Sequence, residues 1–198
     1  QAFKLCPQAQ FIAADSAKYV YTSRKIYAIL QGFSPQIEYL SVDEFVLNPD
    51  GLELIFGPPE VMARKIKDKI KGEFSLTCSI GIAQTRILAK LASKLAKPDG
   101  LLVVKDQGLL EILGATPVEK LCGVGPALKQ KLNSLGVFTG LELLKTPQKL
   151  LVQHFGKVGL WLYESVRLHS QDSPVGAVDS PKEQPKSIGH SYTLPRPI

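Results

Sequence analysis

The stretch that most constrains the fold runs from Phe74 to Gly100 and has the pattern of a strand, a helix and a tight turn. Apolar and small polar residues alternate from Leu76 to Ile82, which is the period expected of a strand with one buried face. The next residues have helical spacing, and their apolar stripe consists of Ile87, Leu88, Leu91 and Leu95. The stretch therefore predicts a strand followed by an amphipathic helix.

The other side of this predicted helix is basic. Arg86, Lys90 and Lys94 recur every fourth residue, and Lys97 follows just beyond them. Long cationic side chains on a helix usually extend into water, so we expect the first three to form a solvated face.

Length and composition exclude several classes of protein. The 198 residues suffice for one good core or two small domains, and a hydrophobic fraction of 44% indicates a globular, soluble chain. No run approaches the roughly 18 apolar residues of a membrane span, and no signal peptide opens the chain. A net charge of +6 permits a polyanionic partner without requiring one. The three cysteines lack metal-ligand spacing, so we expect reduced thiols in an intracellular protein.

The first half of the chain predicts an α+β fold. A helix over residues 16–31 should begin at a cap on Asp15 or Ser16 and bury Val20, Tyr27 and Leu30. A second helix should follow Pro58-Pro59 and run to about Lys71. Strands are expected over residues 9–13, 36–42, 45–47, 52–56 and 101–104. This order fits a mixed or antiparallel sheet with helices on one face, of the ferredoxin-like kind.

The second half predicts a small all-α domain. Short helices separated by glycines are expected over residues 107–113, 118–121, 127–135, 141–144, 148–154 and 158–167. Thr139 with Glu142 three residues later is a capping box. Residues 170–186 have the composition of a linker, and an extended pattern resumes from Ser187 to Leu194.

Two short motifs carry candidate chemistry. Ser41-Val42-Asp43-Glu44 places adjacent carboxylates in a sharp turn, where Mg²⁺ could relieve their repulsion. Lys97-Pro98-Asp99-Gly100 is a turn that could hold a lysine ammonium against a phosphate. Each motif alone is more often a solvated turn.

A third motif, residues 121–127, is a glycine hairpin between two short helices. Gly123, Val124 and Gly125 would let backbone N–H groups approach a DNA phosphate, and Lys129 follows on the next helix. Phe155-Gly156-Lys157-Val158-Gly159 is similar to a degraded second copy. The alternative is a helix connection that binds nothing.

Taken in order, these motifs and Lys186-Ser187-Ile188-Gly189-His190 resemble the Y-family, or translesion, DNA polymerases. The resemblance covers nearly the whole chain. It implies that residues 1–104 form most of the palm, 105–172 the thumb with a helix-hairpin-helix motif, and 173–198 the linker and start of the little finger. It also implies that Asp43 and Glu44 are metal ligands for Mg²⁺ and that Lys97 contacts the incoming deoxynucleoside triphosphate.

The resemblance implies further partners and two departures. Primer-template DNA is the expected substrate, a sliding clamp a possible partner through other regions, and the cytoplasm, or the nucleus in a eukaryote, the expected location. The family's opening palm strand, with the remaining metal-binding aspartate, and its fingers domain are not found in the sequence. We therefore expect an excised piece that is inactive alone.

Two other interpretations stay open. The chain could be a non-catalytic DNA-binding accessory of DNA repair that keeps the polymerase fold. It could also be a plain helix-hairpin-helix module with an unrelated α+β partner, although this would not explain the order of the carboxylates and the lysine turn.

Overall fold

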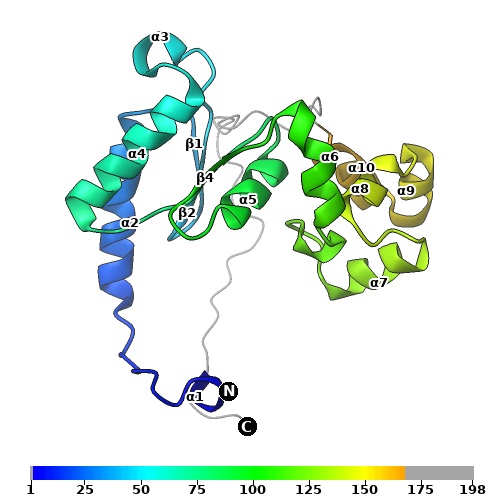
Figure 1. Cartoon of the computed structure of the whole chain (residues 1–198), viewed down its shortest axis with the longest axis horizontal. Helices are drawn as coiled ribbons and strands as arrows, with labels where there is room; N and C mark the ends of the chain where they lie inside the picture. Colours follow the sequence, from blue (N-terminus) through cyan, green and yellow to red (C-terminus); the bar gives the residue numbers. More distant parts are fainter. Residues whose placement is uncertain (1, 168–198) are drawn as a thin grey trace, which may run out of the picture.

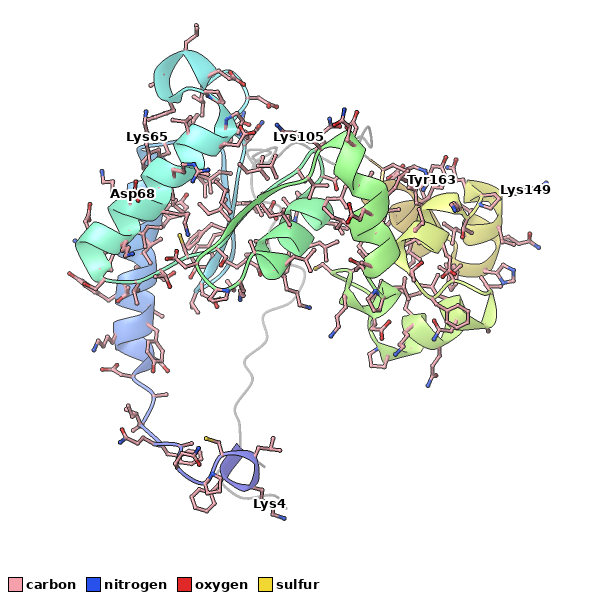
Figure 2. All side chains as sticks on the ribbon, in the orientation of Figure 1. Lys4, Lys65, Asp68, Lys105, Lys149 and Tyr163 are labelled. Carbon is pink, nitrogen blue, oxygen red and sulfur yellow. The ribbon has the colours of Figure 1, made fainter. Side chains whose placement is uncertain are left out.

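The computed structural model describes residues 2–167. The predicted linker over residues 170–186 and the extended segment after Ser187 lie outside these residues. Figure 1 shows two long helices at one end of the molecule, short strands in the middle and a group of short helices at the other end. None of the helices in residues 2–167 has the length and apolar character needed to cross a membrane.

The part up to residue 104 alternates helices and short strands. In chain order these are α1 (Ala2–Leu5), α2 (Ser16–Gln31), β1 (Ile37–Ser41), β2 (Glu44–Leu47), α3 (Glu53–Phe56), α4 (Pro59–Phe74), β3 (Ile80–Ile82), α5 (Arg86–Leu95) and β4 (Leu101–Val103). The strands pair as two separate two-stranded sheets. β1 and β2 form an antiparallel hairpin, whereas β3 and β4 are parallel neighbours connected by α5.

The remainder, up to residue 167, is helical. Its elements are α6 (Asp106–Ala115), the 3₁₀ turn η1 (Val118–Lys120), α7 (Pro126–Ser134), α8 (Gly140–Lys145), α9 (Gln148–Phe155) and α10 (Lys157–Ser165). The predicted all-α character of this segment is thus confirmed. Arg167 fixes its end, because the guanidinium donates to the carbonyls of Tyr163 and Leu144 and lies 3.4 Å from the centre of the Tyr163 ring.

One apolar core packs one face of the β1–β2 hairpin against two helices, α2 and α4. Ile29 and Leu30 of α2 pack with Met62, Ile66 and Ile70 of α4, as the spacing of four in α4 predicted. Ile37 of β1 and Phe45 and Leu47 of β2 pack against these side chains. Because side chains alternate along a strand, Glu38 and Glu44 lie on the other face of the hairpin.

A second core joins α5 to the helices after residue 105. Leu88, Leu91 and Ala92 of α5 share it with buried side chains of α6, α7, α8, α9 and α10. The Oγ1 atom of Thr85, at the start of α5, donates to the carbonyl of Ser165 at 3.2 Å. The predicted strand-helix-turn is therefore connected to the helical half as well as to the strands.

The two-sided burial of β3 and β4 differs from the single covered face that we predicted. Ile80 packs into the first core, against α4, whereas Leu102 packs against the second core, which contains α5. Gly81 faces α5 so closely that a Cβ atom there would lie 2.1 Å from the carbonyl oxygen of Ala89. The α+β class is confirmed, but within residues 2–167 the strands form two separate sheets instead of the single sheet that we predicted. The prediction failed because the alternation of residues shows which face of a strand is buried and does not show which strand it pairs with.

Several predictions about single segments and side chains were wrong. Residues 9–13 form no strand, and Phe11 and Ile12 are exposed because nothing in residues 2–167 pairs with this segment. Residues 52–56 contain helix α3 instead of a strand. Strand β3 begins at Ile80, four residues later than expected, and Leu76 is exposed. Val20 and Leu95, which we expected to be buried, lie at the surface.

Predictions that rested on side-chain caps were confirmed. The Asp15 carboxylate accepts from the Lys18 amide at the start of α2. Thr139 and Glu142 form the reciprocal capping box at the start of α8.

Candidate active site

The two adjacent carboxylates lie in the tight turn of the β1–β2 hairpin. Ser41 pairs with Glu44, so that Val42 and Asp43 form the turn and Glu44 is the first residue of β2. The ladder has an irregularity between Tyr39 and Ser41, and such bulges re-aim neighbouring side chains. Asp43 is exposed, and its Oδ1 atom accepts a hydrogen bond from the Ser41 hydroxyl at 2.6 Å.

Two ion pairs connect this hairpin to helix α5. The Nζ atom of Lys90 lies 2.8 Å from Oε2 of Glu44, and a guanidinium nitrogen of Arg86 lies 2.8 Å from Oε1 of Glu38. Both acids lie on the hairpin face opposite the first core, and both cations lie one turn apart on α5. The prediction that Arg86 and Lys90 simply face water was therefore wrong.

Lys90 also lies beside the glycine hairpin of the helical half. Its pKa is raised, chiefly by the hydrogen bond to Glu44, with smaller contributions from the Cys122 side chain. Cys122 is exposed and, like Cys6 and Cys78, carries a free thiol. The Lys90 ammonium is therefore bonded to the candidate metal-binding turn and lies near the Cys122 side chain of the glycine hairpin.

The donor set of the turn fits a magnesium ion. Mg²⁺ is commonly held by one or two carboxylates, with water and substrate phosphates supplying the remaining oxygens. Asp43 and Glu44 each have one carboxylate oxygen engaged, by Ser41 and Lys90 respectively, and a second oxygen with no hydrogen bond from the described residues. The described residues contain no cluster of three or more His, Cys, Asp or Glu side chains that could hold a metal. Two carboxylates are therefore what this part of the chain offers to the ion.

The lysine turn follows α5 and is closely packed at its end. Lys97 is exposed and forms no salt bridge within residues 2–167. A Cβ atom on Gly100 would lie 2.1 Å from the carbonyl oxygen of Ala96, so glycine is required at this position. The Ser79 hydroxyl spans the turn, because it accepts from the Gly100 amide and donates to the Ala96 carbonyl, each at 3.4 Å.

The structure brings the carboxylates and Lys97 to one helix without placing them in contact. Lys90, the partner of Glu44, lies on α5, and Lys97 lies two residues beyond Leu95, the last residue of that helix. No hydrogen bond or ion pair within residues 2–167 joins Lys97 to Asp43 or Glu44.

The glycine hairpin joins η1 to α7. Gly123 has φ of +88°, and a Cβ atom there would lie 2.4 Å from the ring of Trp161, so both backbone and packing require glycine. Gly125 caps α7, and space around its Cα is open. No group in residues 2–167 accepts a hydrogen bond from the amides of Gly123 and Gly125, which are exposed.

Two other residues predicted to bind DNA have roles within the fold. The side chain of Val124 is buried in the second core, so only its backbone could reach a ligand. The ammonium of Lys129 lies 2.8 Å from the Glu119 carboxylate. That contact lowers the pKa of Glu119.

The second glycine segment connects α9 and α10. Gly156 has φ of +58° and separates the helices. A Cβ atom on Gly159 would lie 2.0 Å from the carbonyl oxygen of Leu151, so this glycine lets the two helices approach closely.

Sequence reasoning did not identify two connections of the site. Lys67 on α4 forms a salt bridge with Asp99 of the lysine turn, and Lys90 forms one with Glu44. The sequence did contain a usable signal for the salt bridges between α5 and the hairpin. Arg86 and Lys90 recur on one face of the helix, and Glu38 and Glu44 fall on one face of the hairpin.

Comparisons with known proteins agree with the motifs. Residues 1–94 match the family described as IMS, impB/mucB/samB. The chain is 38% identical over 200 residues to DNA polymerase IV of Desulfatibacillum aliphaticivorans, covering all of this chain and 48% of the relative. It is 36% identical over 196 residues to DNA polymerase IV of Pelotomaculum thermopropionicum, covering 99% of this chain and 48% of the relative.

Solved structures give the same result. A crystal structure of DinB from Sulfolobus solfataricus superposes with a TM-score of 0.73 at 28% identity, over 88% of this chain and 51% of that one. An insertion ternary complex of Dbh DNA polymerase superposes with a TM-score of 0.72 at 28% identity, over 83% and 48%. The chain spans about half the length of the curated relatives that it matches. Residues 1–94 thus belong to the impB/mucB/samB family, the Y-family DNA polymerases that the motifs of the chain resemble.

Proposed function

We propose that the full-length form, meaning this chain together with the sequence that completes the length of its relatives, is a template-directed DNA polymerase that copies past lesions. The observation that carries the proposal is the joining of the Asp43–Glu44 turn, through Lys90, to the helix that leads into the Lys97 turn. A carboxylate turn bonded to this helix and a lysine just beyond the end of the helix match the needs of nucleotidyl transfer, in which charge develops on phosphate oxygens.

The residues of this chain divide the work as follows. Asp43 and Glu44 would hold Mg²⁺, which when bound stabilises the charge on the attacking and leaving oxygens. Lys97 neutralises part of the charge on the triphosphate of the incoming nucleotide. The reaction is attack of the primer 3′ oxygen on the α-phosphate, with pyrophosphate as the leaving group.

The helical half would hold the primer-template duplex. Residues 1–104 are assigned to the palm, 105–172 to the thumb and 173–198 to the linker and start of the little finger. The exposed amides of Gly123 and Gly125 are suited to bind a DNA phosphate in the manner of a helix-hairpin-helix motif. Lys129 would leave its salt bridge with Glu119 and bind a DNA phosphate instead.

Three further points belong to the proposal. The 198-residue chain alone should not extend a primer at a normal rate, because its described part offers only the Asp43–Glu44 pair to the ion. A sliding clamp would bind through other regions of the full-length form. The expected location is the cytoplasm, as for bacterial polymerases.

Nucleotide binding tests the proposal against its rivals. We expect the full-length form to bind a deoxynucleoside triphosphate in a magnesium-dependent manner, and substitution Asp43→Ala should weaken this binding while leaving duplex affinity intact. A non-catalytic accessory or a simple DNA clamp would bind duplex equally well and show no magnesium-dependent nucleotide binding. That second result would overturn the proposal.

A further inference from the structure

The lysine turn contains a carboxylate that a nucleotide site would have to neutralise. Asp99 lies two residues after Lys97, and its side chain is 38% exposed. A free carboxylate at this position would repel a triphosphate and would compete with it for the Lys97 ammonium. Nucleotide binding at Lys97 therefore requires a cation that neutralises the Asp99 carboxylate.

Lys67 of helix α4 is this cation, because it forms a salt bridge with the Asp99 carboxylate. The Nζ atom of Lys67 lies 2.5 Å from Oδ1 of Asp99 and also donates to the Cys78 carbonyl, just before β3. The Lys67 side chain is only 16% exposed, less than any other cation in the salt bridges of residues 2–167. It is thus held between two groups and is not a freely moving surface lysine.

The backbone adds a reason for this contact. Asp99 has φ of +47°, a left-handed conformation that is uncommon for residues other than glycine and is favoured by contacts that hold the residue there. The bond to Lys67 supplies that hold from a separate helix, while Gly100 and Ser79 fix the following peptide. The ammonium of Lys71, on the same helix, adds a weaker attraction for Asp99.

We propose that Lys67 is a positioning residue for nucleotide binding: it neutralises Asp99 and fixes its carboxylate, so that the Lys97 ammonium stays available to the triphosphate. The inference rests on the proposed function and adds the residue on which the lysine turn depends. Lys67 itself need not touch the nucleotide.

Single-nucleotide incorporation by the full-length form tests this role, with dCTP opposite a templating guanine as the probe. Lys67→Met should raise the KM for dCTP about three- to tenfold and change kcat less than about twofold, because the added repulsion acts on binding. The KM ratio of variant to wild type should shrink as salt increases, since the charges are near the surface. Lys67→Arg should recover most of the affinity.

Two further variants separate charge neutralisation from a purely structural role. Asp99→Asn in the Lys67→Met background removes the uncompensated charge and should return the KM to within about twofold of wild type. Lys69→Met alters an exposed lysine of the same helix and should leave the KM unchanged. Melting temperatures of all variants identify any that fail to fold.

The possible outcomes are distinct. An unchanged KM in folded Lys67→Met protein, or a double variant as impaired as the single one, would overturn the inference and leave the proposed function standing. If the wild-type full-length form incorporates no nucleotide at all, both are overturned. A raised KM that Asp99→Asn restores supports both.

Discussion

The Nζ atom of Lys90 lies 2.8 Å from Oε2 of Glu44, so a helix cation already occupies one oxygen of a carboxylate proposed to hold magnesium. This pair and the parallel pair of Arg86 with Glu38 fix the β1–β2 hairpin against α5. The two ion pairs therefore connect elements that are 46 and 48 residues apart in the chain.

Replacing Lys90 by Met should tighten magnesium binding. A dication about 4 Å from an ammonium is repelled by roughly 2 kcal/mol even in water, whereas losing an exposed ion pair costs only about 0.2–1 kcal/mol. We expect the half-saturating Mg²⁺ concentration for primer extension to fall about two- to tenfold. Lys94→Met, an exposed position on the same helix, is the control and should change nothing. A higher requirement for Mg²⁺ in Lys90→Met would mean that tethering of Glu44 outweighs the repulsion.

Gly81→Ala should destabilise the fold. The new methyl group would overlap the Ala89 carbonyl and the Ser93 amide, and separating β3 from α5 by this amount costs at least about 1–3 kcal/mol. The control is Gly72→Ala on α4, where space is open and alanine should stabilise the helix by about 0.5–1 kcal/mol. Urea unfolding followed by circular dichroism measures both. Equal stability of the two variants would contradict the close contact.

Substitutions in the glycine hairpin should separate effects on folding from effects on DNA binding. Gly125→Ala should keep the melting temperature, because its surroundings are open and its φ is −80°, yet weaken duplex binding by several fold if its amide must reach a phosphate. Gly123→Ala should lower both, because of Trp161 and the positive φ. Fluorescence anisotropy with labelled duplex measures the affinities. Unchanged binding by Gly125→Ala would remove this hairpin from the DNA interface.

Sequence reasoning succeeded for features that depend on residues close together in the chain. Helix α4 and the caps at Asp15 and Thr139 were predictable because each depends on residues within four positions of one another. The salt bridges of Glu44 and Asp99 were not, because their partners lie more than 30 residues away. The parallel pairing of Ile80 with Leu101 was not predictable either, because a whole helix separates the two strands. The sequence supplied the chemical groups of the site, and tertiary structure decided which of them face one another.

The acid side of the pH profile tests the Lys67–Asp99 pair. The hydrogen bond from Lys67 lowers the pKa of Asp99 below its usual range. Because the folded pKa is depressed, the pair contributes stability above the unfolded value of about 3.9, and this contribution is lost as pH falls through the folded value. Carboxyl ¹³C NMR should place the Asp99 midpoint below about 3.9 in wild type and close to it in Lys67→Met. The same midpoint in both proteins would contradict the contact, and Lys69→Met should titrate like wild type.

The central claim is that Asp43 and Glu44 hold the metal of a DNA polymerase, and the most direct test is primer extension by the full-length form carrying Asp43→Ala and Glu44→Ala. Asp43 is exposed in the hairpin turn and Glu44 is only half-buried beside it, so the double variant should keep its melting temperature within a few degrees and its affinity for primer-template. The account predicts a loss of nucleotide incorporation of at least about a hundredfold. Incorporation at the wild-type rate by the folded double variant would contradict it.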